Sequence, residues 1–153
     1  MGILFANALQ VDVPANSEGS VEATMTVPEP IDLVVLTSHA HNFLSRFEMF
    51  AYRGGAPSKE PIYVNEDWES PAVRVLDPPL HLEAGDGVMF RCSYRNDTAT
   101  KLGWGITNGE MCMPFVMYAY PPGAARRVPP TMSVAMSSST PTLLQIGNGG
   151  FGG

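Results

Sequence analysis

The fold is decided around residues 33–41, which read Leu33-Val34-Val35-Leu36-Thr37-Ser38-His39-Ala40-His41. The first four residues form a short apolar run, which is typical of a β-strand buried on both faces. The run continues directly into a His-x-His pair. Because side chains at positions i and i+2 of a strand point to the same side, we expect His39 and His41 to project together, roughly 6–7 Å apart along the strand.

The segments on either side of this strand predict further short strands. Apolar residues at positions 21, 23, 25 and 27 alternate with polar ones, as in half-buried strands. Turn signals at 77–79, 84–87 and 96–98 separate the later candidates, and no apolar stripe of helical period exceeds two turns. We therefore expect an all-β fold, an antiparallel β-sandwich of jelly-roll type with roughly eight to ten strands. The candidates after residue 41 are 43–51, 62–68, 72–76, 80–82, 88–94, 102–106 and 111–120.

The composition agrees with one small domain. With 153 residues, 15 glycines and 14 prolines, the chain has no room for long helices, and its 44% of hydrophobic residues excludes a disordered polymer. The net charge of -6 and the absence of a basic stripe argue against nucleic acid as a partner. No run approaches the ~18 apolar residues of a membrane span. The N-terminus lacks the basic start of a signal peptide.

The composition changes beyond Tyr120. We expect the domain to span residues 1–121 and an extended, Pro/Ser/Gly-rich tail to span 122–153; residues 128–153 contain no charged residue and no histidine. One interpretation is a low-complexity tail without fixed structure. The other is that Thr142 to Ile146 forms an added strand on a neighbouring surface, in this chain or in another subunit. The tail is then a site for a protein partner or for self-association.

The two cysteines, Cys92 and Cys112, allow three interpretations: a disulfide, a reduced pair in the core, or metal ligands. If they are bonded, the protein is extracytoplasmic, either periplasmic or secreted. The bridge then closes a 20-residue loop and contributes on the order of 3 kcal/mol. Met111, which precedes Cys112 after a glycine turn, is in that case held at a fixed point beside the bridge.

His39 and His41 alone are a weak metal signal, because such pairs also occur on solvent-facing strands. The third histidine, His81, lies between two leucines and is expected at the surface or rim. A third donor is either Glu48, folded back from seven residues on, or a methionine, for which Met111 has the most distinctive setting. Two nitrogens and one neutral sulfur suit copper, particularly Cu(I), better than zinc, magnesium or calcium.

Five sequence blocks together resemble the C-terminal half of the type II copper, ascorbate-dependent monooxygenases, the family of the peptidylglycine α-hydroxylating and dopamine β-monooxygenases. The resemblance is closest to bacterial members and covers roughly residues 3–121. The blocks are Ser38-His39-Ala40-His41, Asp77-Pro78-Pro79-Leu80, Ala84-Gly85-Asp86, Arg91-Cys92-Ser93-Tyr94-Arg95-Asn96 and Glu110-Met111-Cys112.

The resemblance implies a jelly-roll sandwich that binds one copper ion per chain, where oxygen is activated. The implied copper ligands are His39, His41 and Met111, and the implied disulfide joins Cys92 to Cys112. The implied partners are O2, an organic substrate and an external electron donor.

Two departures from the family pattern bear on activity. The family enzymes carry a second copper on three further histidines in an N-terminal domain, whereas His81 is the one unassigned histidine here. At the family positions that hold a substrate carboxylate, this chain has Thr37, Met113 and Phe115, which cannot pair with an anion as an arginine does. They form a more apolar pocket wall. The residues Phe43, Trp68 and Trp104 either line a pocket near the metal or pack in the sandwich core.

Two functions are therefore compatible with the sequence. The first is a copper-dependent monooxygenase-like domain that hydroxylates a C–H bond of an organic substrate. The second is a non-catalytic copper-binding or structural subunit of an extracellular assembly, built on the same sandwich and its tail. Ascorbate-dependent oxygen consumption separates the two.

Overall fold

The computed structural model describes residues 1–124, 133–136 and 146–149. These residues form strands and connecting loops, without a helix. The strands are β1 (Gly2–Ala6), β2 (Asp12–Val13), β3 (Ser17–Thr26), β4 (Ile31–Ala40), β5 (Leu44–Arg53), β6 (Ala56–Pro57), β7 (Tyr63–Asn65), β8 (Arg74–Leu82), β9 (Gly87–Asn96), β10 (Leu102–Gly103), β11 (Cys112–Ala119), β12 (Ser133–Met136) and β13 (Ile146–Gly149).

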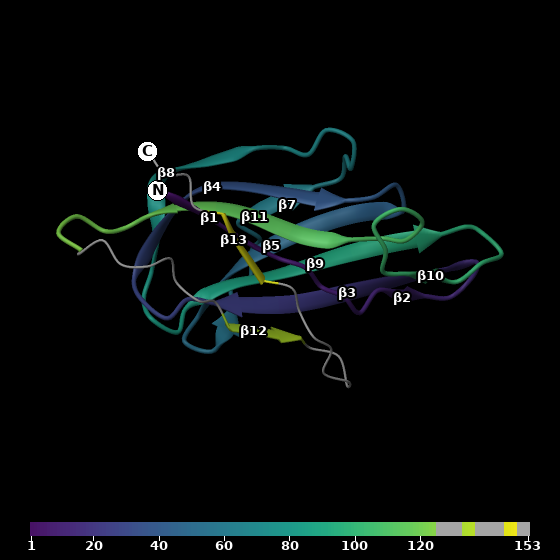
Figure 1. Ribbon diagram of the computed structural model, residues 1–153, viewed down its shortest axis with the longest axis horizontal. Coiled ribbons are helices and arrows are strands. Elements are labelled where there is room, and N and C mark those ends of the chain that lie inside the picture. Colours follow the sequence, from purple (N-terminus) through teal and green to yellow (C-terminus); the bar gives the residue numbers. More distant parts are fainter. Residues whose placement is uncertain (125–132, 137–145, 150–153) are drawn as a thin grey trace.

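The strands form two antiparallel sheets that lie one above the other (Figure 1). The first has the order β13-β1-β11-β4-β8, and the second has the order β12-β3-β9-β5-β6, with β7 also paired to β5. The short pair β10-β2 stands apart. Along the chain, the long strands β3, β4, β5, β8, β9 and β11 alternate between the two sheets. The expected all-β sandwich is confirmed.

The core lies between the sheets and is built by alternation along each strand. In β11, the buried and half-buried positions alternate without exception, so that Val116 and Tyr118 face inward while Met117 faces outward. Aromatic rings fill the centre: Phe47 stacks on Phe90 at 6.4 Å and meets Tyr63 edge-on at 6.2 Å. Alternating burial of this kind is what a half-buried strand requires.

Strand β4 differs from the expectation in one respect. Leu33 and Leu36 are buried, but Val34 and Val35 are half-buried, so the apolar run is not enclosed on both faces. The reason is the two-layer architecture, in which each sheet turns one face to the core. The outer face of β4 is therefore available for a site.

The segment Asp77-Pro78-Pro79 is not the turn that was expected between two strands. It lies inside β8, an edge strand, where the register with β4 is interrupted between the pairs Leu33–Leu80 and Val35–Val75. Residues 76–79 form an irregularity in a continuous strand. Proline has no N–H to give to a ladder, so an unpaired stretch of an edge strand accommodates it.

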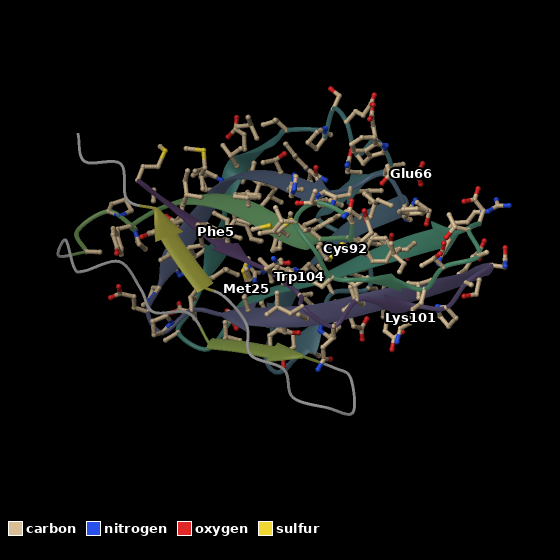
Figure 2. The ribbon with its side chains drawn as sticks, turned by 45° about the vertical axis from the view of Figure 1, so that its right-hand side comes forward. Phe5, Met25, Glu66, Cys92, Lys101 and Trp104 are labelled. Atoms are coloured by element: carbon tan, nitrogen blue, oxygen red, sulfur yellow. A yellow bond between two sulfur atoms is a disulfide. The ribbon has the colours of Figure 1, made fainter. Side chains whose placement is uncertain are left out.

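A disulfide between Cys92 of β9 and Cys112 of β11 joins the two sheets, as the family resemblance implied. Both cysteines are fully buried, and Figure 2 shows Cys92 inside the sandwich, with Glu66 and Lys101 at its periphery. The bridge closes a loop of 20 residues, which restricts the unfolded chain and stabilises the fold by about 3 kcal/mol.

Two strands from the tail add to the sheet edges of the same chain. Strand β12 pairs with β3, and β13 pairs with β1, antiparallel in each case. The expected added strand at 142–146 overlaps with β13 only at Ile146, and residues 142–145 lie outside the described residues. Within the described part of the chain, no helix could cross a membrane.

Candidate metal centre

The two histidines of the His-x-His pair lie together where β4 ends. His39 is exposed on the outer face of the sheet, and His41 follows one residue after the strand and is half-buried. Their ring centroids are 5.2 Å apart, with the ring planes at 82°. The predicted projection of both imidazoles to one side is consistent with this separation.

A hydrogen bond to the backbone fixes the orientation of the His41 ring. Its Nδ1 atom lies 2.6 Å from the carbonyl oxygen of Gly109. A carbonyl oxygen can only accept, so Nδ1 carries the proton, and in the neutral ring Nε2 keeps its lone pair. Metal-binding histidines are typically oriented in this way, by a hydrogen bond from the nitrogen that does not bind the metal.

The surroundings of His39 favour the neutral form of its ring. Its pKa is lowered from the ordinary value, first because partial burial disfavours the charged form and second because His41 lies beside it. An unprotonated imidazole near neutral pH has a nitrogen lone pair available for a metal.

The register between β4 and β11 brings the second half of the candidate site to this pair. Met113 is opposite His39, and Cys112 is opposite Ala40. The paired residues end at Cys112 and Ala40, and Met111 and His41 each follow the end of the ladder by one residue. Directly opposed residues of an antiparallel pair share a face of the sheet, with Cβ atoms about 4.5–5.5 Å apart.

The backbone of Met111 is held by a buried tyrosine. The hydroxyl of Tyr94, which is 1% exposed, donates to the carbonyl oxygen of Met111 at 2.8 Å. The disulfide joins the next residue, Cys112, to β9. Met111 itself is half-buried. Its backbone is held at its carbonyl oxygen by Tyr94 and at the next residue by the disulfide.

Glu110, in the loop between β10 and β11 that also carries Met111, is fully buried. Its Oε2 accepts a hydrogen bond from the backbone N–H of His41 at 3.3 Å, and the backbone of Phe43 also donates to the carboxylate. Its Oε1 lies 3.9 Å from Nδ1 of His41 and has no hydrogen-bond partner. Burial raises the pKa of Glu110 to about 7, although these backbone hydrogen bonds oppose the shift.

Sequence reasoning quoted Glu110 in a motif but gave it no role. The signal was present, because Glu110 continues the inward-facing alternation of Cys112, Pro114 and Val116. A carboxylate in a core-facing position needs a structural reason. The carbonyl of Gly109 was also missed, since a backbone acceptor leaves no mark on the sequence.

Other candidate donors lie elsewhere. Glu48 belongs to β5 in the opposite sheet and pairs with Arg46 at 3.2 Å, so it does not fold back to the histidines. His81 is 47% exposed on β8, where Asp32 and Glu83 contact its two ring nitrogens, in agreement with the expected surface position. Among the described residues, no three His, Cys, Asp or Glu side chains are arranged to hold a metal.

The three residues predicted as a pocket wall, Thr37, Met113 and Phe115, are half-buried on β4 and β11. Phe115 is opposite Thr37, two pairs along from Met113 and His39. The ring of Phe115 stacks on Phe5 of β1 at 5.5 Å. The hydroxyl of Thr37 donates to the carbonyl of Ala72 at 3.0 Å.

A pocket of about 430 Å³ opens next to His41. Phe43 and Trp68 line it, whereas Trp104, Thr37, Met113 and Phe115 do not. The two tryptophans are 39% and 37% exposed, so the alternative that they pack in the sandwich core is wrong. Phe43 does pack against the core.

These features define a class of protein: a disulfide-linked β-sandwich with a histidine pair at the end of β4, next to the start of β11, where the disulfide cysteine Cys112 follows Met111. A family model described as copper type II ascorbate-dependent monooxygenase, C-terminal domain, matches residues 13–145. The chain belongs to this family. The match continues beyond residue 121 into the tail. A search of curated proteins finds no match to the chain.

Proposed function

We propose that the chain binds one copper ion through His39, His41 and Met111, and that it is the oxygen-activating domain of a copper monooxygenase. The observation that supports this most is the β4–β11 register, in which Met113 is opposite His39 and Cys112 is opposite Ala40. Extending this register by one residue would put Met111 opposite His41. By the same alternation its thioether would lie on the face of the sheet that carries both imidazoles, which supports the proposal.

The chemistry of the donor set fits copper. Two imidazoles, each binding through an unprotonated nitrogen, and a thioether would form an uncharged, partly soft donor set, which suits Cu(I). The described residues offer no group of three His, Cys, Asp or Glu side chains as an alternative. A third donor from this part of the chain is therefore of another type, and we propose the thioether of Met111.

Bound copper supplies the site with O2 binding and one-electron chemistry. The chain's own residues keep the donors in place: the Gly109 carbonyl orients His41, Glu110 holds the backbone at His41, and Tyr94 holds the backbone of Met111. Three donors leave a coordination position open, as a catalytic metal site requires.

Hydroxylation consumes R–H, O2, two electrons and two protons and yields R–OH and water. A single copper ion at this site would supply one electron, so the second electron would have to come from a donor outside the site. Ascorbate or a partner domain meets that need. A second copper in this chain would need three further histidines, and only His81 remains, with both of its ring nitrogens in contact with carboxylates.

The compartment follows from the same features. The Cys92–Cys112 disulfide and the family of secreted enzymes support an extracytoplasmic location, periplasmic or secreted. An oxidising compartment keeps the disulfide formed next to Met111.

The test is metal analysis combined with oxygen uptake. The purified chain, with its disulfide intact and supplied with Cu(I), is expected to retain one copper ion per chain. His39→Ala is expected to lose it, while His81→Ala, the third histidine, retains it. Ascorbate-dependent oxygen consumption by the wild type and not by His39→Ala supports the monooxygenase. Equal copper retention by both variants would contradict the site, and copper binding without oxygen consumption would favour a non-catalytic copper module.

A further inference from the structure

The pocket beside His41 is formed by two loops that come from distant parts of the sequence. One loop, residues 66–73, carries Trp68, and the other, residues 104–111, carries Ile106 and Asn108. Asn42 and Phe43 complete the lining between them. The volume of about 430 Å³ is in the range of pockets that bind small organic molecules.

The loop that carries Trp68 is held in place by side-chain hydrogen bonds. Oδ1 of Asn65 accepts from the backbone N–H of Asp67 and of Ala72, which ties together the two ends of the loop. Oδ1 of Asp67 accepts from the N–H groups of Glu69 and Ser70. The indole is therefore presented on an ordered loop although it is 39% exposed.

The opposite loop is equally constrained. The backbone N–H of Glu110 donates to Gly103 at 2.8 Å, and the N–H of Gly105 donates back to Glu110 at 3.2 Å. A Cβ atom on Gly109 would lie 2.4 Å from the backbone nitrogen of Gly105, so the loop closes too tightly for any other residue there. Ile106, at the tip, is 73% exposed.

The lining of the pocket is mixed, with polar groups beside an apolar part, and it carries no Lys, Arg, Asp or Glu. The apolar part is an indole, a phenyl ring and the Ile106 side chain, and the polar part is the His41 ring, the Thr107 hydroxyl and the amides of Asn42 and Asn108. An exposed tryptophan and isoleucine on ordered loops leave apolar surface that a ligand can cover. The amides offer hydrogen bonds to a neutral polar group.

We propose that this pocket binds a neutral organic molecule, with its apolar face on Trp68 and Ile106, and holds it next to His41. The inference rests on the proposed function in one respect, that His41 binds copper, and it then names the class of substrate. In the metal-free chain an anion is disfavoured, because Asp67 and Glu69 flank Trp68 and no Lys or Arg lines the pocket. The charge of the whole chain, -6, acts in the same direction.

Three probes of one shape and different charge test the proposal: phenylacetamide, phenylacetate and phenethylammonium. Binding to the metal-free chain is measured by ligand-observed NMR. We expect phenylacetamide to bind with a Kd of about 1 mM, as a fragment of this size can. The Trp68→Ala and Ile106→Ser variants are expected to weaken it by about fivefold or more. Trp104→Ala, a tryptophan of similar exposure that does not line the pocket, leaves the Kd unchanged.

The proposal is overturned if phenylacetate binds as tightly as the amide, or if phenethylammonium binds more tightly in a salt-dependent way. It is also overturned if Trp68→Ala and Ile106→Ser bind the amide normally. A second arm repeats the measurement with Cu(II): broadening of the probe's ring protons, absent in His39→Ala, shows that copper and ligand are neighbours. Trp68-dependent binding without copper-dependent broadening retains the pocket and refutes the copper site instead.

Discussion

Nδ1 of His41 lies 2.6 Å from the carbonyl oxygen of Gly109 and donates its proton to it. This bond joins the end of one strand to the loop that leads into the next, two residues before Met111. The ring orientation of one proposed copper ligand is therefore coupled to the backbone that carries another. A substitution in the loop should therefore change the affinity for copper even when no proposed ligand is replaced.

Gly109→Ala tests that coupling. The new Cβ would lie 2.4 Å from the nitrogen of Gly105, so the loop must shift and take the acceptor of His41 with it. We expect the affinity for Cu(I) to fall about tenfold or more, the usual effect of losing a group that orients a metal ligand. Gly103→Ala is the matched control, because its Cβ would meet Val11 at an ordinary 3.9 Å. Competition with a chromogenic Cu(I) chelator measures both, and equal affinities would contradict the coupling.

Glu110 should stabilise the metal-free fold through the backbone groups that it binds. Glu110→Ala leaves the N–H groups of His41 and Phe43 without an acceptor and is expected to cost about 1–3 kcal/mol of unfolding free energy. Glu110→Gln keeps an acceptor oxygen and should cost clearly less. Denaturant titration of the two variants compares them, and an equal loss in both would show that the hydrogen bonds are not the reason.

The disulfide should contribute by restricting the unfolded chain. Replacing both cysteines by alanine, Cys92→Ala with Cys112→Ala, removes a link across 20 residues and is expected to cost about 3 kcal/mol. Since Cys112 adjoins Met111, copper affinity is expected to fall as well. Urea titration gives the first quantity. A double variant as stable as the wild type would mean that the core alone holds the two sheets together.

His81 makes the stability of the fold depend on pH. Its Nδ1 lies 2.7 Å from Asp32 and its Nε2 lies 3.2 Å from Glu83, and these contacts raise its pKa, with the Asp32 hydrogen bond first. A raised pKa means that the stabilisation is fully present below the unfolded value of about 6.5 and is lost as the pH rises through the folded value. We expect the unfolding free energy of the wild type, relative to His81→Gln, to decrease from pH 6 to pH 9. If the difference in unfolding free energy stays constant over this range, the ion pairs of His81 do not stabilise the fold.

The alternation in the sequence was sufficient to predict the sandwich and the side to which the histidines project. It predicted less where tertiary context decides. The apolar run at 33–36 has the composition of an enclosed strand, but β4 belongs to one of two large sheets that pack against each other on one face, so Val34 and Val35 are only half-buried. At Asp77-Pro78-Pro79 the local turn signal was overridden, because an edge strand tolerates unpaired residues.

At the candidate site, the residue types were visible in the sequence and the supporting contacts were not. The His-x-His pair and the Met-Cys dipeptide stand out by composition, whereas the Gly109 carbonyl and the Tyr94 hydroxyl act through the backbone. Trp68 shows the same limit, since its exposure depends on the Asn65 and Asp67 hydrogen bonds that order its loop. The strand register brings the loop at 66–73 next to the loop at 104–111, and the sequence alone does not reveal that register.

X-ray absorption spectroscopy of the Cu(I)-loaded chain tests the central claim most directly, because it counts the atoms bound to the metal. We expect two nitrogen neighbours and one sulfur neighbour, with the sulfur contribution absent in Met111→Leu and present in Met113→Leu, its neighbour on the same face. A spectrum without sulfur, or a sulfur contribution that persists in Met111→Leu, would contradict the assignment of copper to His39, His41 and Met111.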